Sequence, residues 1–487
     1  MKLIVKLQSK ITLETRPVRQ RFIKVLESNI RNLLRRVDKQ INTGINLLDI
    51  EINTDNNNID NRLALIDSLK RIPGISHFTE VKRYEFIDPK DILDKTLAVH
   101  AKTIENKSFC LQIKKIGTQD FNLSQIEQYV LRGLTESVKN TKLELTKPDV
   151  TIYLEIKKNE LSIVTDTHGG LGGLPIGTQL DVLALVNADN DSGVASYQMI
   201  KKGCRTHYCF FNLGNSDHEA VVKQLCYYLW TTYGSSHKVK FFTVDLEPVI
   251  EKISNNVEQS HKRQFFNRLM MHAAEKIALK ANIQALVTSE SIEQNSSEVL
   301  ASFNAVKGTT TPLVLRPLIA CDKKKVTTIA REIGIEYYTK TVSEYPLNKF
   351  KNTNPILKNE EEINFNGDVL ARVINEAKVY DIRDIGRATE AEIKVVDMVE
   401  QIPEGTIIID IRSPEESENN PLTLDGVKIK PLPFYKLASQ FINFDHSKEY
   451  LLYCDHGVMS KIQALLLIES GFKNVKVYRP RDKKVII

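Results

Sequence analysis

The chain has 487 residues, a length that predicts about three domains rather than a single compact core. Hydrophobic residues make up 42% of the sequence and charged residues 26%, which excludes a disordered or collagen-like chain and predicts globular domains. No run approaches the ~18 uncharged apolar residues of a membrane span, and Lys6 interrupts the opening apolar run too early for a signal peptide. We therefore expect a cytoplasmic protein with no membrane partner.

The positive charge is concentrated in the first 50 residues, which hold eleven basic and four acidic side chains in a chain of net charge +6. After a strand-like run at 3–7, apolar residues at helical spacing over 17–37 predict an amphipathic helix that carries Arg31, Arg35 and Arg36. These arginines are candidate RNA contacts, because a basic face favours a polyanion partner. A plain solvated helix face is the alternative.

The next part of the chain mixes short helices and strands. The Asn-rich stretch 53–61 is typical of a loop or hairpin end. Helices are expected at 62–70 and 124–140, a strand at 107–115, and a strand pair at 150–164.

From residue 175 onward, near-continuous apolar runs alternate with helical patterns, as expected for strands buried on both faces of a parallel sheet. The predicted strands are 181–187, 207–213, 238–244, 285–290 and 312–319, and the predicted helices lie near 193–202, 216–233, 264–281 and 323–333. This alternation predicts a doubly wound α/β domain. The polar stretch 347–367 is typical of a linker or exposed excursion, and a last small α/β unit begins near residue 402.

The six cysteines are too sparse for a disulfide scaffold, and none forms a Cys-x-x-Cys pair or a zinc-ligand spacing. They are Cys110, Cys204, Cys209, Cys226, Cys321 and Cys454. We therefore expect no structural metal site, and a cysteine with a special role must have it through its reactivity.

Cys454 ends an apolar strand and is followed by a short loop and a predicted helix at 460–470. A cysteine at this place faces backbone N–H groups and the positive end of a helix dipole, which stabilise a thiolate or persulfide anion. The alternative is a buried core cysteine at a strand end. A companion strand that ends in Asp410 and Arg412 favours the reactive role, because the two strands together resemble a rhodanese domain, in which this cysteine carries sulfur as a persulfide.

The resemblance extends over the whole chain. It is to the bacterial tRNA 4-thiouridine synthases, sulfurtransferases that also supply sulfur for the thiazole of thiamine. The motifs that carry it lie at 16–32, 109–121, 147–156, 169–179, 203–214, 315–323, 432–437 and 450–480.

This resemblance implies a multidomain α/β protein with a doubly wound parallel sheet. The expected domains are a ferredoxin-like N-terminal domain at 1–60, a THUMP RNA-binding domain at 61–165, a PP-loop-type adenylation domain at 175–385 and a rhodanese domain at 402–487. The implied partners are tRNA, a cysteine desulfurase as sulfur donor and the thiamine sulfur-carrier protein. The implied cofactor is ATP, with magnesium as the only metal.

The family's pyrophosphate loop, Ser-Gly-Gly-x-Asp-Ser, wraps phosphate with backbone N–H groups at a helix N-terminus. The corresponding loop 187–192 reads Asn-Ala-Asp-Asn-Asp-Ser, so only Asp191 and Ser192 match. Ala188 restricts the backbone, and Asp189 brings a negative charge to where phosphate oxygens would lie. Both changes oppose ATP binding, so the loop is predicted to be degenerate.

Further positions around the nucleotide also differ from the family. Where the resemblance places a Lys, a Gly and a Gln, this chain has Asn267, Ser289 and Glu298. Four apolar residues do fit the adenine and ribose end, with plain core packing as the alternative: Leu185, Val186, Phe210 and Phe211.

The sulfur relay and the RNA-binding strand depart from the family as well. Pro346 stands where the family has a second cysteine, and Cys321 could replace it, although a core or incidental role is favoured. His456 takes the place of a common Arg in the rhodanese loop and can titrate near neutrality. The expected RNA contacts of the THUMP strand are Lys114 and Lys115, with Ile116 and Gln119 where Arg or His is usual.

Three functions are compatible with these residues. The first is transfer of persulfide sulfur from a cysteine desulfurase through Cys454 to uridine 8 of tRNA. The second is an ATP-independent persulfide carrier for thiazole synthesis, and the third a non-catalytic tRNA-binding protein. The changed nucleotide positions favour the second or third on physical grounds, whereas the resemblance itself favours the first.

Overall fold

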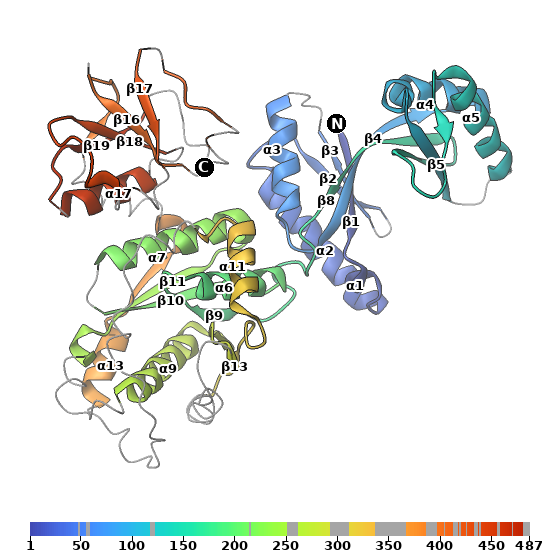
Figure 1. Ribbon diagram of the computed structural model, residues 1–487. Coiled ribbons are helices and arrows are strands. Elements are labelled where there is room, and N and C mark those ends of the chain that lie inside the picture. The colour runs from blue at the N-terminus through green and yellow to red at the C-terminus, as the bar shows by residue number, and fades with distance from the viewer. Residues whose placement is uncertain are drawn as a thin grey trace. The chain divides into compact units, whose positions relative to one another are not determined.

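A computed structural model gives the fold (Figure 1). It divides into two compact units, one made of residues 1–180 with 199–205 and 232–237, and one made of the rest. The residues described are 1–46, 49–54, 59–116, 122–213, 216–250, 262–292, 311–336, 367–385, 397–403, 405–412, 417, 420–424, 426–432, 437, 440–454, 458–469 and 471–480.

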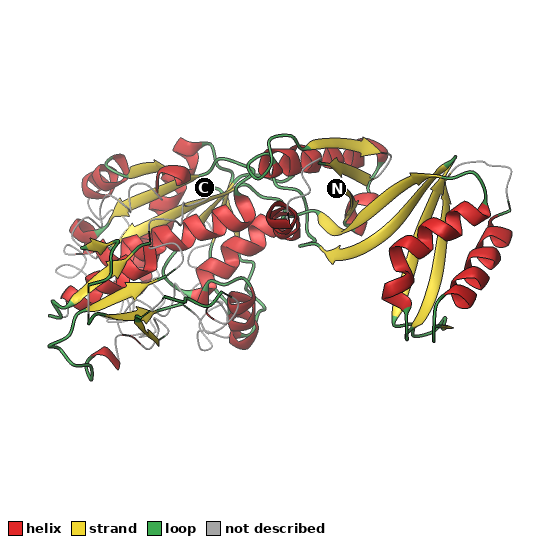
Figure 2. Ribbon diagram, turned by 90° about the horizontal axis from the view of Figure 1, so that it is seen from above, coloured by secondary structure: helices red, strands yellow, loops and turns green. Residues whose placement is uncertain are grey.

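The first unit is built on an eight-stranded sheet with the order β2-β3-β1-β4-β8-β7-β5-β6. Its strands are β1 (Lys2–Leu7), β2 (Asn42–Asn46), β3 (Asp49–Asn53), β4 (Ile75–Glu85), β5 (Ser108–Ile116), β6 (Lys142–Leu143), β7 (Val150–Lys157) and β8 (Glu160–Gly169). Its helices are α1 (Ser9–Thr12), α2 (Arg16–Leu34), α3 (Ile59–Lys70), α4 (Pro89–Ile104) and α5 (Leu123–Ser137). Figure 2 distinguishes the helices, in red, from the yellow strands on which they pack.

Two hydrophobic cores lie on this sheet, and strands β4 and β8 run through both halves. The first core joins α2 and α3 to β1 and β3 and includes Leu65 and Phe78. The second core joins α4 and α5 to β5, β7 and the other end of β8, and includes Ile126 and Ile163. Helix α3 therefore packs with the N-terminal strands, and the division between the two cores falls within β4.

The glycine-rich segment 170–179 is fixed by backbone contacts within the first unit. The Leu174 N–H donates to the Lys201 carbonyl, and the Gly177 N–H donates to the Gly203 carbonyl, both at 3.0 Å. Gly173 has a φ of +77°, and a Cβ at this position would lie 2.0 Å from the Lys201 carbonyl oxygen. Only glycine fits this backbone approach.

The described residues between 181 and 385 include a six-stranded sheet with the order β13-β12-β9-β10-β11-β14. Its strands are β9 (Val182–Leu185), β10 (Thr206–Asn212), β11 (Lys240–Asp245), β12 (Ala285–Val287), β13 (Leu313–Leu315) and β14 (Lys378–Asp381). Its helices are α6 (Asn190–Lys201), α7 (Ser216–Leu229), the π-helical η1 (Trp230–Gly234), α9 (Lys262–Ala281), α11 (Lys323–Glu332) and α13 (Gly367–Asn375). The expected doubly wound fold is confirmed, with one difference: the edge strand β14 is antiparallel to β11.

The C-terminal part of the chain forms a five-stranded parallel sheet with the order β15-β19-β18-β16-β17. Its strands are β15 (Met398–Val399), β16 (Ile407–Asp410), β17 (Lys428–Pro431), β18 (Tyr450–Tyr453) and β19 (Val475–Tyr478), and helix α17 (Val458–Glu469) follows β18. Ile408, Leu451, Tyr453 and Tyr478 form its core. Across all the helices described, none is long and apolar enough to cross a membrane.

Candidate functional site

Cys454 lies between the end of strand β18 and the start of helix α17. The side chain is 8% exposed. Its Sγ accepts a hydrogen bond from the Ser460 backbone N–H at 3.3 Å and lies 3.4 Å from the Ser460 hydroxyl. Because Ser460 is in the first turn of α17, this N–H belongs to the positive end of the helix dipole. The arrangement stabilises a sulfur anion, either thiolate or persulfide.

A buried ion pair fixes the strand beside Cys454. The Arg412 guanidinium donates to both carboxylate oxygens of Asp410, at 2.9 and 2.7 Å, and to the Asn420 carbonyl at 2.9 Å. It also lies over the Tyr453 ring, 5.1 Å from the centroid. Asp410 is paired with Tyr453 across β16 and β18, so the ion pair supports the strand end from which Cys454 extends.

Sequence reasoning missed Ser460, the donor to Cys454. A hydroxyl residue six positions beyond a strand-end cysteine, at the start of a helix, was the available signal. His456 lies outside the part of the chain that the structure describes.

The loop 187–192 follows β9 at the switch point of the six-stranded sheet, between β10 on one side and β12 on the other. Ligands of doubly wound sheets commonly bind at this edge. Asp189 Oδ1 accepts the Ser192 backbone N–H at 2.7 Å, which is the bond of a helix N-cap. The Ser192 hydroxyl donates to the Asn187 carbonyl at 2.9 Å and accepts the Asn187 N–H at 3.0 Å.

His218 of helix α7 completes this loop, and it too was not predicted from the sequence. Its Nε2 lies 2.6 Å from Asn187 Oδ1, and its ring stacks on Phe210 with centroids 5.8 Å apart. Burial lowers the pKa of His218 below its ordinary 6.5, although the nearby Asp189 charge acts in the opposite direction. The imidazole is therefore neutral at pH 7 and supplies no positive charge for a phosphate.

The predicted nucleotide residues are only partly brought together. Phe211 packs in the core of the α/β domain and the half-buried Leu185 packs against that core, whereas Val186 and Phe210 are buried. Asp191 lies in the first turn of α6. Two further positions are half-buried, one on α9 and one after β12: Asn267 and Ser289. Glu298 and Pro346 lie outside the described residues.

ATP is the cofactor that this fold family implies, and the loop residues do not fit its pyrophosphate. The Asp189 carboxylate already accepts the hydrogen bond of the Ser192 backbone N–H. The buried imidazole of His218 beside the loop is neutral. We therefore derive no chemical step through ATP at this site.

The basic helix α2 uses part of its charge within the first unit. Arg31 forms an ion pair with the buried Glu27 at 3.1 Å. Arg36 donates to the Ser235 carbonyl at 2.6 Å, whereas Arg35 is exposed at the helix end. On strand β5, Lys114 is exposed and Lys115 half-buried. Gln119 is not among the residues described.

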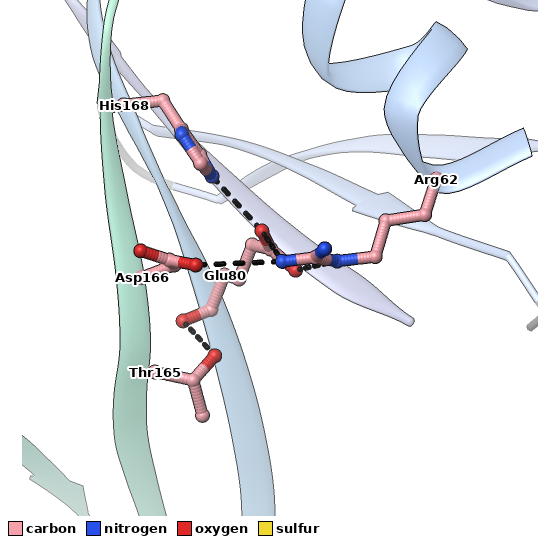
Figure 3. A network of polar contacts seen from close by, with 5 residues as sticks. All are labelled: Arg62, Glu80, Thr165, Asp166 and His168. Atoms are coloured by element: carbon pink, nitrogen blue, oxygen red, sulfur yellow. Dashed lines mark hydrogen bonds and ion pairs between the residues drawn. The ribbon is translucent and has the colours of Figure 1, made fainter. Parts of the chain in front are cut away.

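A second polar cluster lies where β4 and β8 pass between the two cores of the first unit (Figure 3). Both carboxylate oxygens of Glu80 accept from Arg62, at 2.9 and 2.7 Å, and one lies 2.9 Å from His168 Nε2. Asp166 lies 3.4 Å from the same guanidinium. Although Glu80, Asp166 and His168 are close enough to share a cation, Arg62 already provides the positive charge, so the cluster is a structural ion-pair network.

The fold and the Cys454 site define a multidomain sulfur-transfer protein. Three family models match the chain: THUMP domain over 87–166, Thiamine biosynthesis protein (ThiI) over 177–363, and Rhodanese-like domain over 395–479. The tRNA sulfurtransferase of Colwellia psychrerythraea is 56% identical over 484 residues, covering 99% of this chain and 100% of the relative. That of Yersinia enterocolitica is 43% identical over 485 residues, with the same coverage. The chain belongs to the tRNA sulfurtransferase family.

The solved structures support the same fold. A 4-thiouridine synthetase in complex with RNA and bound ATP matches with a TM-score of 0.69 at 23% identity, covering 78% of this chain and 99% of that chain. A protein from Pyrococcus horikoshii matches with a TM-score of 0.52 at 20% identity, covering 69% and 100%.

Proposed function

We propose that this protein is a sulfurtransferase that carries sulfur as a persulfide on Cys454. The observation that carries the proposal is the Ser460 N–H directed at Cys454 Sγ from the first turn of α17. The Cys454 thiolate attacks the outer sulfur of a donor persulfide, as a cysteine desulfurase would present. A new S–S bond forms, the donor S–S bond breaks, and the donor leaves as a thiolate, so no net oxidation occurs.

We propose uridine 8 of tRNA, the position that the family resemblance implies, as the acceptor, and the comparisons support tRNA as the substrate class. Full-length relatives are named tRNA sulfurtransferases, the THUMP model matches residues 87–166, and the N-terminal segment is basic. Because Pro346 replaces the family's second cysteine, release of sulfur from Cys454 draws on a separate thiol reductant. The solved 4-thiouridine synthetase carries bound ATP, but the loop 187–192 of this chain does not fit the pyrophosphate, so no activation of uridine by ATP at this loop is proposed.

Delivery to the thiamine sulfur-carrier protein is the second candidate function. It needs the rhodanese-like domain and no nucleotide, and the matching Thiamine biosynthesis protein (ThiI) model supports it. The Asp189 cap on the loop 187–192 favours it over the tRNA step.

Mass spectrometry tests the persulfide. The full chain is incubated with a cysteine desulfurase and cysteine, and we expect a mass increase of one sulfur atom on the peptide that contains Cys454. Cys454→Ser should abolish the increase, whereas Cys321→Ser should retain it. An unmodified Cys454 in folded protein contradicts the proposal.

The 4-thiouridine content of tRNA separates the two acceptors. In a strain that lacks its own tRNA sulfurtransferase, this gene restores 4-thiouridine if tRNA is the acceptor. If the gene restores growth on medium that lacks thiazole, but the tRNA still contains no 4-thiouridine, the thiamine carrier is the acceptor.

A further inference from the structure

We infer that the loop 187–192 is a self-capped helix terminus that does not hold the triphosphate of ATP, with the Asp189 carboxylate in the place of the bound anion. This inference goes beyond the proposed function, which requires only the chemistry of Cys454.

The first argument is the hydrogen bonding of the loop. A phosphate at a helix N-terminus is held by backbone N–H groups that have no partner inside the helix. Here the Ser192 N–H is bonded to Asp189 Oδ1 at 2.7 Å, and the Asn187 N–H is bonded to the Ser192 hydroxyl at 3.0 Å. Two donors that a pyrophosphate could use are therefore already satisfied by the chain itself.

The second argument is the charge. A phosphate oxygen that reached the Ser192 N–H would have to displace the Asp189 carboxylate, and the two anions would then remain in close contact. His218, the nearest ring to Asn187, is neutral at pH 7 because burial lowers its pKa. The neighbours named here supply no cation to offset the repulsion.

The third argument is the backbone. Among the residues described, the left-handed region of φ is occupied at several glycines, such as Gly172 and Gly173, but at no residue of the loop 187–192. The loop thus follows an ordinary N-cap turn that Ala188 and Asp189 adopt without strain. It does not show the glycine-dependent conformation with which a phosphate-wrapping loop turns successive N–H groups inward.

Calorimetric titration of the full chain with magnesium-ATP tests the inference. We expect no saturable binding by the wild type up to millimolar nucleotide. Asp189→Gly frees the Ser192 N–H and removes the charge, so it should raise the affinity for ATP at least tenfold. Asp189→Asn keeps a good cap without the charge and should gain less than Asp189→Gly.

Asp88→Gly is the matched control. Asp88 caps helix α4 by accepting the Asp91 N–H at the same distance, 2.7 Å, so this variant loses an equivalent cap elsewhere and should leave ATP binding unchanged. Circular dichroism confirms that each variant is folded. If Asp189→Gly does not fold, Ala188→Gly combined with Asp189→Asn serves in its place and should also gain affinity.

Three results would overturn the inference. They are micromolar ATP binding by the wild type, a folded Asp189→Gly variant with no gain, and an Asp189→Asn variant that gains as much as Asp189→Gly, because charge alone would then be the barrier. Persulfide loading of Cys454 is measured on the same preparations without ATP, and its outcome does not depend on whether the loop 187–192 binds ATP. Failure of the proposed function is thereby distinguished from failure of this inference.

Discussion

The six cysteines differ in what surrounds their sulfur atoms, and this difference assigns their chemistry. Cys209 and Cys226 are completely buried, and burial raises the pKa of both thiols, so neither forms a thiolate at neutral pH. Cys321 is half-exposed after β13. Cys454 has a backbone N–H and a hydroxyl of a helix N-terminus directed at its sulfur.

Thiol labelling provides the first prediction. In the folded protein at pH 8, iodoacetamide should modify Cys321 but leave Cys209 and Cys226 unmodified, because their thiols are buried and protonated. Peptide mass spectrometry before and after addition of denaturant measures this. Labelling of Cys209 without denaturant would show that the strand β10 core opens readily.

Replacement of Ser460 by alanine provides the second prediction. The variant keeps the backbone N–H but loses the hydroxyl 3.4 Å from Cys454 Sγ. A hydrogen bond of this kind contributes about 0.5–1.5 kcal/mol, so the rate of Cys454 persulfide formation should fall roughly two- to tenfold. Ser447→Ala, which alters an exposed turn in the same domain, should leave the rate unchanged. Equal rates for Ser460→Ala and wild type would show that the backbone N–H acts alone.

At the scale of elements, regular apolar patterns predicted the structure and irregular ones did not. Helix α2 has apolar residues at helical spacing, and strands β9 to β13 come from near-continuous apolar runs. These elements lie within a few residues of the predicted ranges. Strand β4 and helix α4 were not predicted. Strand β4 leaves one core and enters the other, and its register with β8 shifts between Glu80 and Val81. Its apolar residues therefore do not alternate regularly.

The features of the candidate site also divide into those that the sequence predicts and those that it does not. The position of Cys454 at a strand end followed by a helix is a local feature, which the sequence shows. The contacts of Asn187 with His218, and of Arg36 with Ser235, join residues that are far apart in the chain. No spacing rule contains such contacts, so the sequence could not predict them.

The ion-pair network where β4 and β8 pass between the two cores supports the third prediction. Arg62→Ala leaves the buried Glu80 without its guanidinium partner, which should destabilise the protein by about 1–3 kcal/mol. Denaturant unfolding measures this. The exposed pair of Arg71 and Asp67 is the matched control, and Arg71→Ala should cost less than about 1 kcal/mol. Equal effects of the two variants would contradict a special role for the network.

The same network predicts how stability depends on pH. Burial raises the pKa of Glu80, but Arg62 and His168 outweigh this effect and hold the pKa below its ordinary value of 4.5. A carboxyl group whose pKa is lower in the folded state stabilises it above the unfolded pKa, and this contribution is lost as the pH falls through the folded value. The free energy of unfolding should therefore decline below pH 4.5, and decline less in Glu80→Gln.

At the scale of the whole molecule, the proposed RNA-binding helix and the proposed sulfur carrier belong to parts of the chain with separate cores. The basic helix α2 packs in the first core, and Cys454 extends from the last parallel sheet. Because phosphate binding depends on the summed positive field rather than on one side chain, changes in the loop 187–192 need not affect it. We therefore expect tRNA binding to be independent of whether the loop 187–192 binds ATP.

Replacement of Arg31, Arg35 and Arg36 by alanine tests this expectation. The triple variant should bind tRNA more weakly, and the slope of log K against log salt should fall by roughly 0.7–0.9 for each phosphate that is no longer neutralised. Arg35→Ala alone should weaken binding without loss of stability, because Arg31 and Arg36 also make contacts within the fold. Filter binding across a salt series measures both quantities.

The controls for this test come from the second unit. Asp191→Ala changes the loop and should leave tRNA affinity unchanged. Arg331→Ala removes one positive charge, as Arg35→Ala does, from an exposed position on α11 and should not alter the salt slope. If Arg35→Ala and Arg331→Ala behave alike, helix α2 is only a solvated basic face, because equal charge loss in the two units would then have equal effect. The RNA contacts would in that case lie on strand β5, where Lys114 is exposed, and Lys114→Ala should then reduce the slope.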